Sequence, residues 1–346
     1  MTNIFKLGLL CLILAGLGCL KQRPLSLNPK TTIKTTGFGP LWAPEATGPR
    51  VATGDSRLKR MWPSMGTFLR VEIRGLSEPY ALAAAKAAHE VVDRYDQLMS
   101  LYKPESELSG LNREGGHRCV HVSAETQKMI DMALQIARET QGAFDPTVGP
   151  FSKGRYEKVQ KAGSGCYFFS IPDLRIDLGG IAKGGALDEA LEVIKQFGAS
   201  AAYVDLGGNG GVFGGSKGNN RWFFEIAVPQ RQKKLFPLLR LDQGFISTSN
   251  QKENPGHILD PESGRPVEGD LDSVTVISEN GARGDALSTA LFVMGAKKAK
   301  NYLEKHSEIS ACLVMTSGKS VSPEEDRLFC RPFGAQNGGE FLWIGQ

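Results

Sequence analysis

The sequence predicts an α+β fold in which strands pair and helices pack on them within one domain. Segments that alternate apolar and polar residues indicate strands, and segments with apolar residues every three or four positions indicate helices. The two kinds do not alternate regularly, which disfavours a doubly wound parallel sheet. With 346 residues, 41% hydrophobic and 23% charged, the chain has the length and composition of an ordinary globular protein. No internal repeat is visible.

The first elements follow from local patterns. Phe68–Arg74 alternates apolar and charged residues, which predicts a half-buried strand. Tyr80–Leu101 places apolar residues on one face and predicts a helix. Ser123 predicts the cap of a second helix. A third helix is expected after Gly184, ending at the C-terminal glycine Gly198.

In the C-terminal half one further helix is expected, at Asp285–Met294. The expected strands are Ala201–Leu206, Trp222–Val228, Ser273–Ile277, Ile309–Met315 and Glu340–Ile344.

The N-terminus predicts export. Lys6 precedes the short apolar run Leu7–Leu17, which is too short to span a bilayer comfortably and is typical of a signal peptide. Cys19 follows at once, as in bacterial lipoproteins whose cysteine is lipidated after cleavage. We therefore predict a signal peptide over residues 1–19 and a lipid anchor on Cys19. The protein is then expected on the periplasmic side of a cell membrane.

Residues 20–57 contain Pro, Gly, Thr and Lys without hydrophobic periodicity, which predicts a flexible linker. The folded domain is expected over residues 58–346. Its four cysteines, in an exported protein, permit disulfides in three pairings, although incidental thiols fit equally well. They are Cys119, Cys166, Cys312 and Cys330. A net charge of +4, with no basic run that contains aromatics, excludes a nucleic-acid-binding protein.

The segment from Arg175 to Phe197 carries the strongest local signal. A predicted strand ending in Asp177 leads into Gly179 and Gly180, then Lys183 and a helix. Glycines let the backbone approach a ligand, and the N–H groups at a helix start attract anions. Together with the charge of Lys183, this predicts a site for a phosphate-bearing ligand. The spacing matches neither the dinucleotide motif nor the P-loop, and a tightly packed turn explains the glycines equally well.

A second group of residues offers oxygen ligands and a base. Asp285 and Thr289 are four apart on a predicted helix and share a face, which suits Mg²⁺. In the alternative interpretation, Asp285 caps the helix and Thr289 bonds back to its carbonyl. His257 precedes a short turn, and an unperturbed pKa of about 6.5 suits a general base. It would otherwise bond to that turn.

Six segments occur in an order that is specific as a set. They are MGT from Met65, SLYKPESELSGLN from Ser100, GAFDPTVGP from Gly142, IDLGGIAKG from Ile176, VDLGG from Val204, and HILDPESGRPV from His257 followed by DALSTAL from Asp285. In sequence and order they resemble the motifs of the ApbE family, the FAD:protein FMN transferases. The resemblance spans about Met61 to Gly295.

The resemblance implies a T-fold-related α+β domain with mixed or antiparallel sheets. It also implies an exported, often lipid-anchored, Mg²⁺-dependent enzyme that splits FAD. Such enzymes attach FMN through a phosphoester to a Ser or Thr in a DGxSGAT-like segment of a target flavoprotein and release AMP. Two alternatives are an FAD pyrophosphatase that yields FMN and AMP, and a lipoprotein that binds FAD without turnover. Gly185, where the family usually has an aromatic residue, favours the last.

The resemblance also assigns roles to residues. Asp285, Thr289 and the carbonyl of Gly180 match the metal ligands. His257 matches the base, and Lys183 would neutralise phosphate charge. The remaining matches are FAD contacts: Met65, Ala143, Phe144, Asp145, Asp177, Lys183 and a residue near Leu259.

Overall fold

The computed structural model describes residues 56–150, 152–215, 222–226, 235–251, 255–316, 328–331 and 340–345. The predicted signal peptide, Cys19 and nearly all of the predicted linker lie outside the described residues. Within the described part, no helix has both the length and the apolar character needed to cross a membrane.

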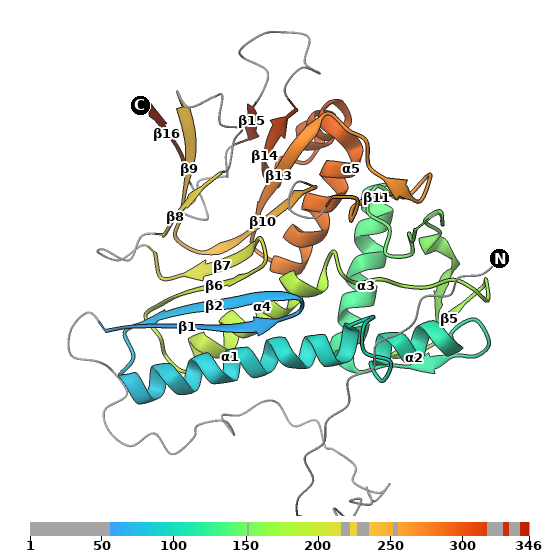
Figure 1. Cartoon of the computed structure of the whole chain (residues 1–346), viewed down its shortest axis with the longest axis horizontal. Helices are drawn as coiled ribbons and strands as arrows, with labels where there is room; N and C mark the ends of the chain where they lie inside the picture. The colour runs from blue at the N-terminus through green and yellow to red at the C-terminus, as the bar shows by residue number, and fades with distance from the viewer. Residues whose placement is uncertain are drawn as a thin grey trace, which may run out of the picture. The chain divides into compact units, whose positions relative to one another are not determined.

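An eight-stranded sheet forms the centre of the domain, with strand order β1-β2-β6-β7-β10-β13-β14-β15 (Figure 1). All of its neighbouring strands are antiparallel. Its strands are β1 Arg57–Ser64, β2 Thr67–Arg74, β6 Ala201–Leu206, β7 Asn209–Phe213, β10 Gly244–Asn250, β13 Leu271–Ser278, β14 Ser310–Met315 and β15 Leu328–Arg331. The predicted α+β class is confirmed.

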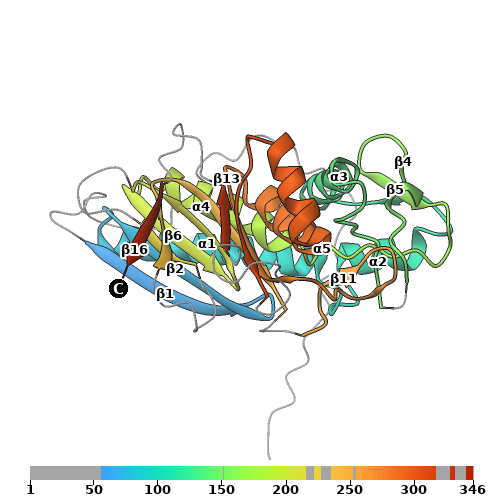
Figure 2. The ribbon, with the colours of Figure 1, turned by 90° about the horizontal axis from the view of Figure 1, so that it is seen from above.

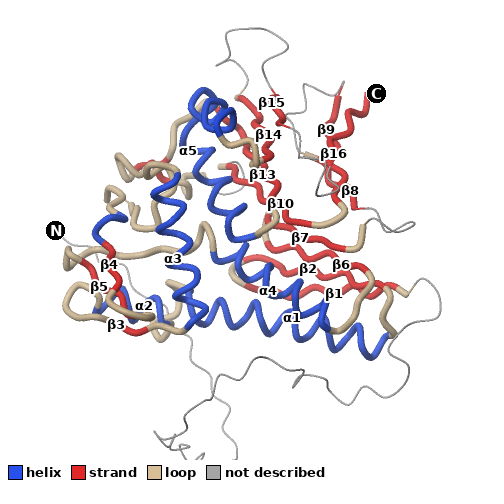
Figure 3. The backbone as a smooth tube through the Cα atoms, turned by 180° about the vertical axis from the view of Figure 1, so that it is seen from behind, coloured by secondary structure: helices blue, strands red, loops and turns tan. Residues whose placement is uncertain are grey.

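Helices cover one face of this sheet (Figures 2 and 3). α1 (Glu78–Met99), α4 (Ala182–Gln196) and α5 (Gly281–Lys305) contact its strands directly. α3 (Ala124–Glu139) packs against α1 and α5, and the short α2 (Glu107–Glu114) against α1. The main hydrophobic core fills the space between these helices and the inner face of the sheet.

A three-stranded sheet packs on the other face. Its order is β16-β9-β8, with β8 Trp222–Glu225, β9 Leu235–Leu241 and β16 Glu340–Gly345. Trp222 and Leu239 form a second apolar cluster with Ile246 and Ile277 of the central sheet. The smaller elements are β3 Val120–His121, β4 Val159–Lys161 and β5 Cys166–Phe169 in one sheet, the hairpin β11 Leu259–Asp260 and β12 Arg265–Pro266, and the 3-10 helix η1 Tyr156–Lys158.

Two predicted helix ends, the start of the helix after Ser123 and the end of the helix before Gly198, agree with the structure. Ser123 caps α3 by accepting a hydrogen bond from the N–H of Thr126, as predicted. Gly198, just beyond α4, has φ 86°, as expected of a glycine after a helix C-terminus. α4 itself begins at Ala182, so Gly184 lies inside the helix and not before it.

The expected start of the last helix, at Asp285, is wrong. α5 begins at Gly281, and Asn280 caps it by accepting a hydrogen bond from Arg283 N at 2.8 Å. Asp285 therefore lies in the second turn and does not cap the helix. The helix also runs on to Lys305, past a kink at Gly295 where φ is 71°.

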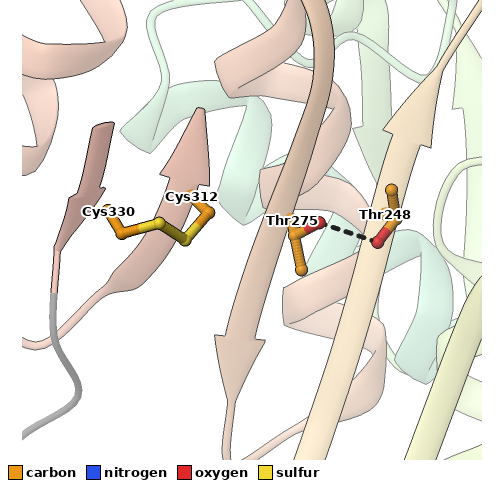
Figure 4. The surroundings of a disulfide bond; sticks show 4 residues. All are labelled: Thr248, Thr275, Cys312 and Cys330. Atoms are coloured by element: carbon orange, nitrogen blue, oxygen red, sulfur yellow. Dashed lines mark hydrogen bonds between the residues drawn. A yellow bond between two sulfur atoms is a disulfide. The ribbon is translucent and has the colours of Figure 1, made fainter. Parts of the chain in front are cut away.

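Two disulfides select one of the three pairings left open by the sequence. Cys119 bonds to Cys166 at the start of β5, across 47 residues of chain. Cys312 bonds to Cys330 at directly opposite positions of β14 and β15 (Figure 4). The second bond fastens β15 to its neighbour in the central sheet.

Candidate active site

The N-terminal ends of α4 and α5 meet at one buried point. The backbone N–H of Gly184 donates to Oδ2 of Asp285 at 3.1 Å. A Cβ atom built on Gly180 would lie 3.6 Å from Oγ1 of Thr289. The structure thus brings together the three residues matched to the metal ligands, although they are about a hundred positions apart in the chain.

Asp285 is 5% exposed, and its carboxylate is surrounded by donors. Burial raises the pKa of this carboxyl, while the charge of Lys183, the N–H of Gly184 and the side-chain amide of Asn209 act in the opposite direction. An ionised carboxylate in such a place needs a compensating positive charge.

The oxygen set at this point fits a hard divalent cation. The described residues contain no cluster of three His, Cys, Asp or Glu side chains that could hold a metal ion. A cation here would therefore have to use hydroxyl and carbonyl oxygens beside one carboxylate, which Mg²⁺ accepts. Thr289 Oγ1 lies 3.2 Å from Ser249 Oγ and donates to the carbonyl of Asp285 at 3.4 Å, so its alternative role in the helix is also present.

The turn before α4 is tied down by short contacts. Oδ1 of Asp177 accepts the N–H of Gly179 at 2.7 Å, and Nζ of Lys183 donates to the carbonyl of Gly179 at 2.9 Å. The N–H of Asp177 donates to the carbonyl of Pro146 at 2.7 Å. Asp177 is exposed, and Lys183 is half-buried beside the turn. Both therefore lie at the predicted phosphate site.

The expected strand ending in Asp177 is absent, for a specific reason. The backbone of Ile176 pairs with a side chain and not with another strand: Nδ2 of Asn112 donates to its carbonyl at 2.8 Å, and Oδ1 of Asn112 accepts its N–H at 2.7 Å. The SLYKPESELSGLN segment thus holds this turn in place through Asn112.

The GAFDPTVGP segment packs against the same turn. The ring of Phe144, 4% exposed, would be 3.2 Å from a Cβ at Gly180. Oδ1 of Asp145 accepts the N–H and the hydroxyl of Thr147 at 2.8 and 2.7 Å, and Oδ2 accepts the N–H of Tyr156 at 3.2 Å. Oδ1 of Asp145 thus serves its own turn, as in the plain-turn alternative, and Oδ2 ties this turn to η1. Ala143 is half-buried beside Phe144.

The β11–β12 hairpin lies next to this segment. The carbonyl of Pro261 accepts the N–H of Gly154 at 2.8 Å, and Gly154 has no space for a Cβ because Asp145 is there. Leu259 is half-buried in β11, whereas His257 is exposed just before it. His257 therefore lies on the surface of the hairpin that borders the site.

Met65 lies in the β1–β2 turn with φ 49°, half-buried. Thr67, at the end of this turn, is in close contact with Gly207 in the β6–β7 turn. Both turns lie at the same end of the central sheet. Strand β7 starts there, with Asn209 as its first residue. Met65 is thus placed at the end of the sheet that carries the site.

The missing aromatic at Gly185 does not remove a wall of the site. A Cβ here would overlap with the sulfur of Met129 on α3 and lie 3.2 Å from the ring of Tyr95 on α1. Gly185 therefore faces the helix core and allows close packing of three helices. The argument for a binding protein without turnover loses its main support.

The sequence did not reveal the residues on other elements that hydrogen-bond to the first turns of α5. Asp188 on α4 accepts the N–H groups of Gly281 and Ala282 at 2.6 and 3.0 Å. Asn209 and Ser249 contact Asp285 and Thr289. Asn209 directly follows the VDLGG segment, whereas Ser249 lies in none of the six segments, so only Asn209 had a sequence signal, its proximity to a motif.

Asp188 makes stability depend on pH. Burial raises its pKa from 3.8 to about 6, more than the two backbone N–H groups lower it. Between those values the unfolded chain is ionised while the folded chain holds the proton, so stability should fall as pH rises from about 4 to about 6 and then level off. Urea unfolding of Asp188→Asn at several pH values should show this part of the pH dependence removed. An unchanged slope would contradict the assignment.

The residues of this site all lie within the part of the chain that matches a known family. The sequence model described as "ApbE family" matches residues 65–313, which includes every residue of the site. The chain belongs to the ApbE family.

Relatives of this ApbE chain include named flavin transferases and proteins of known structure. It is 27% identical over 293 residues to the FAD:protein FMN transferase of Salmonella typhimurium, covering 74% of this chain and 83% of that protein. It is 28% identical over 294 residues to that of Escherichia coli K12, covering 74% and 84%.

Two solved structures show the same fold. The flavin transferase ApbE from Vibrio cholerae matches with a TM-score of 0.69 at 22% identity, over 84% of this chain and 97% of that chain. The apo flavinyl transferase ApbE of Pseudomonas stutzeri matches with a TM-score of 0.70 at 25% identity, over 77% and 92%. The α+β fold predicted for this ApbE chain is therefore that of known flavin transferases.

Proposed function

We propose that this chain is an enzyme, a Mg²⁺-dependent FAD:protein FMN transferase that attaches FMN to a Ser or Thr of a target flavoprotein and releases AMP. The observation that carries the proposal is the meeting of the Gly180 turn and Lys183 with Asp285 and Thr289 at one point. The relatives named FAD:protein FMN transferase support the choice of FAD as substrate and of a flavoprotein as acceptor.

Three residues of this chain would hold the Mg²⁺ ion: Asp285 through its carboxylate, Thr289 through its hydroxyl and Gly180 through its carbonyl. When bound, the ion supplies positive charge to the pyrophosphate of FAD. The carboxylate of Asp285 is buried and, within the described residues, forms no ion pair with a basic side chain, which supports this assignment.

Lys183 and the turn before α4 would bind the phosphates. The ammonium group of Lys183 lies beside the Gly179 carbonyl and can turn to a phosphate oxygen. There it would neutralise the negative charge that develops on the leaving AMP. Asp177, which fixes the turn, has one carboxylate oxygen left for a hydroxyl of FAD. Met65, Ala143, Phe144 and Leu259 would provide apolar contacts around the flavin.

His257 would act as the general base. Its exposed position just before β11 lets a side chain of another protein reach it. It would take the proton of the acceptor hydroxyl as that oxygen bonds to the FMN phosphorus and the bond from this phosphorus to AMP breaks. Water in place of the hydroxyl would give FMN and AMP, which is the pyrophosphatase alternative.

We also propose that the protein is exported and held on the periplasmic side of a cell membrane by a lipid on Cys19, with residues 20–57 as a linker. The support is the sequence pattern alone. Replacement of Cys19 by Ala should release the protein from the membrane fraction, whereas continued membrane association would count against the anchor.

One assay tests the reaction. The chain without its first 19 residues is incubated with FAD, Mg²⁺ and a target domain that contains a DGxSGAT-like segment. Mass spectrometry should show one FMN adduct on the target, and an equal amount of AMP should appear. A target whose acceptor Ser or Thr is replaced by Ala is the control. Free FMN without an adduct would favour the pyrophosphatase, and bound FAD without AMP would refute the enzyme.

A further inference from the structure

A row of polar side chains crosses the inner face of the central sheet under α5. Ser247 of β10 stands directly opposite Asn209 of β7, and Ser249 follows on the same face. All three are buried, Asn209 to 4% exposure and Ser247 to 1%. Polar groups in a core lower stability unless they are bonded, so this row in an otherwise apolar face needs an explanation.

Each member of the row faces the turn of α5 that carries the proposed ligands. Ser249 Oγ lies 2.8 Å from Ser288 Oγ and 3.2 Å from Thr289 Oγ1. Ser247 Oγ would lie 3.2 Å from a Cβ at Gly284, next to Asp285. The side-chain amide of Asn209 hydrogen-bonds to the carboxylate of Asp285.

The two ends of the Asn209 amide differ in their partners. An ionised carboxylate only accepts hydrogen bonds, so the NH₂ group of Asn209 is the donor to Asp285. Its Oδ1 is buried and has no hydrogen-bond partner among the described residues. An apolar side chain could fill this space without the free-energy cost of burying an unpaired oxygen. The retained amide therefore indicates a polar task at this position.

We propose that Asn209 is a positioning residue that orients the Asp285 carboxylate for the divalent cation. The inference rests on the metal site of the proposed function. The N–H of Gly184 on α4 and the amide of Asn209 on β7 hold the carboxylate from two elements, while α5 carries it. Such groups behind a ligand fix its direction, and their loss typically weakens metal binding 10- to 100-fold.

The test measures Mg²⁺ binding without FAD, using the chain without its first 19 residues. Thermal unfolding is followed across a MgCl₂ titration, and calorimetry gives the Mg²⁺ concentration at half-saturation. For Asn209→Leu, half-saturation should move at least about 10-fold higher. For Asn209→Asp, Tm without Mg²⁺ should fall, and the rise in Tm on adding Mg²⁺ should exceed that of the wild type. Two adjacent carboxylates repel each other until a cation neutralises them.

Thr248→Val is the matched control. Thr248 lies between Ser247 and Ser249 but on the other face of the sheet, and its hydroxyl is 2.9 Å from that of Thr275 (Figure 4). Losing this bond should lower Tm slightly and leave the Mg²⁺ half-saturation unchanged.

The outcomes separate the inference from the proposed function. A wild-type protein that shows no response to Mg²⁺ contradicts the metal site itself. If the wild type responds and both Asn209 variants keep its half-saturation within twofold, the positioning role is overturned. If Asn209→Leu does not fold, Asn209→Asp decides, because a Mg²⁺-induced rise in Tm no larger than that of the wild type overturns the role.

Discussion

Replacing Asp285 by Asn should lower the rate of FMN transfer by about 10³-fold or more. The amide keeps the shape of the side chain but removes the only carboxylate among the three proposed ligands, so the pyrophosphate charge is left without its cation. The rate of AMP release at saturating FAD, measured over a range of Mg²⁺ concentrations, checks this. The variant should stay folded, because Asn can still accept the hydrogen bond from the N–H of Gly184.

Asp205→Asn is the matched control. Asp205 is also largely buried at a strand end, but its carboxylate pairs with Arg70 at 3.0 Å, away from α5. This variant should transfer FMN at nearly the wild-type rate. A wild-type rate and Mg²⁺ dependence in Asp285→Asn would show that the metal is held elsewhere or is not needed.

Removing the Cys119–Cys166 disulfide should lower the free energy of unfolding by about 4 kcal/mol. The bond closes a loop of 47 residues, and in the chain-entropy account a longer loop gives a larger gain by restricting the unfolded chain. The loop contains α3 and the GAFDPTVGP segment, so the site should become less stable with it. Urea unfolding of Cys119→Ala/Cys166→Ala measures the change.

The second disulfide provides a comparison within the same chain. Cys312 and Cys330 are separated by 18 residues, so Cys312→Ala/Cys330→Ala should lose less, about 3 kcal/mol. Adding a reductant to the wild type should lower its stability at least as much as either double variant. Stability that does not respond to reductant would rule out both bonds as stabilising elements in solution.

The proposed ligands on α5 could be predicted because their relation is local. Residues four apart on a helix share a face wherever the helix starts, so Asp285 and Thr289 point the same way although α5 begins at Gly281. The start itself was missed although Asn280 is a local capping residue, and the rest of the cap is distant. Asp188 supplies two hydrogen bonds there from 93 and 94 residues away, and no pattern near Gly281 reveals it.

The residues behind the site could not be predicted for a related reason. Asn209 and Ser247 become neighbours only through the register of β7 and β10, and β7 contains two glycines that weaken its strand pattern. The sequence also could not predict whether Gly185 faces the site or the helix core. It depends on which side chains of α1 and α3 lie beside Gly185, here Tyr95 and Met129, and motif order does not determine this.

Motif resemblance marks candidate residues but does not separate residues that would bind from residues that support. Asn112 lies in one of the six segments and acts as a backbone partner of Ile176. Asp145 holds its own turn through Oδ1 and accepts the N–H of Tyr156 through Oδ2. The hydrogen bonds show what the motifs do not, that Asn112 and Asp145 each hold backbone groups around the candidate site.

The most direct test of a cation held between the Gly180 turn and α5 is anomalous diffraction from crystals grown with FAD and Mn²⁺ in place of Mg²⁺. The proposed site predicts a manganese peak about 2.0–2.4 Å from a carboxylate oxygen of Asp285, from Oγ1 of Thr289 and from the carbonyl oxygen of Gly180. Well-ordered FAD with no manganese at that position, or with manganese bound only to other residues, would contradict it.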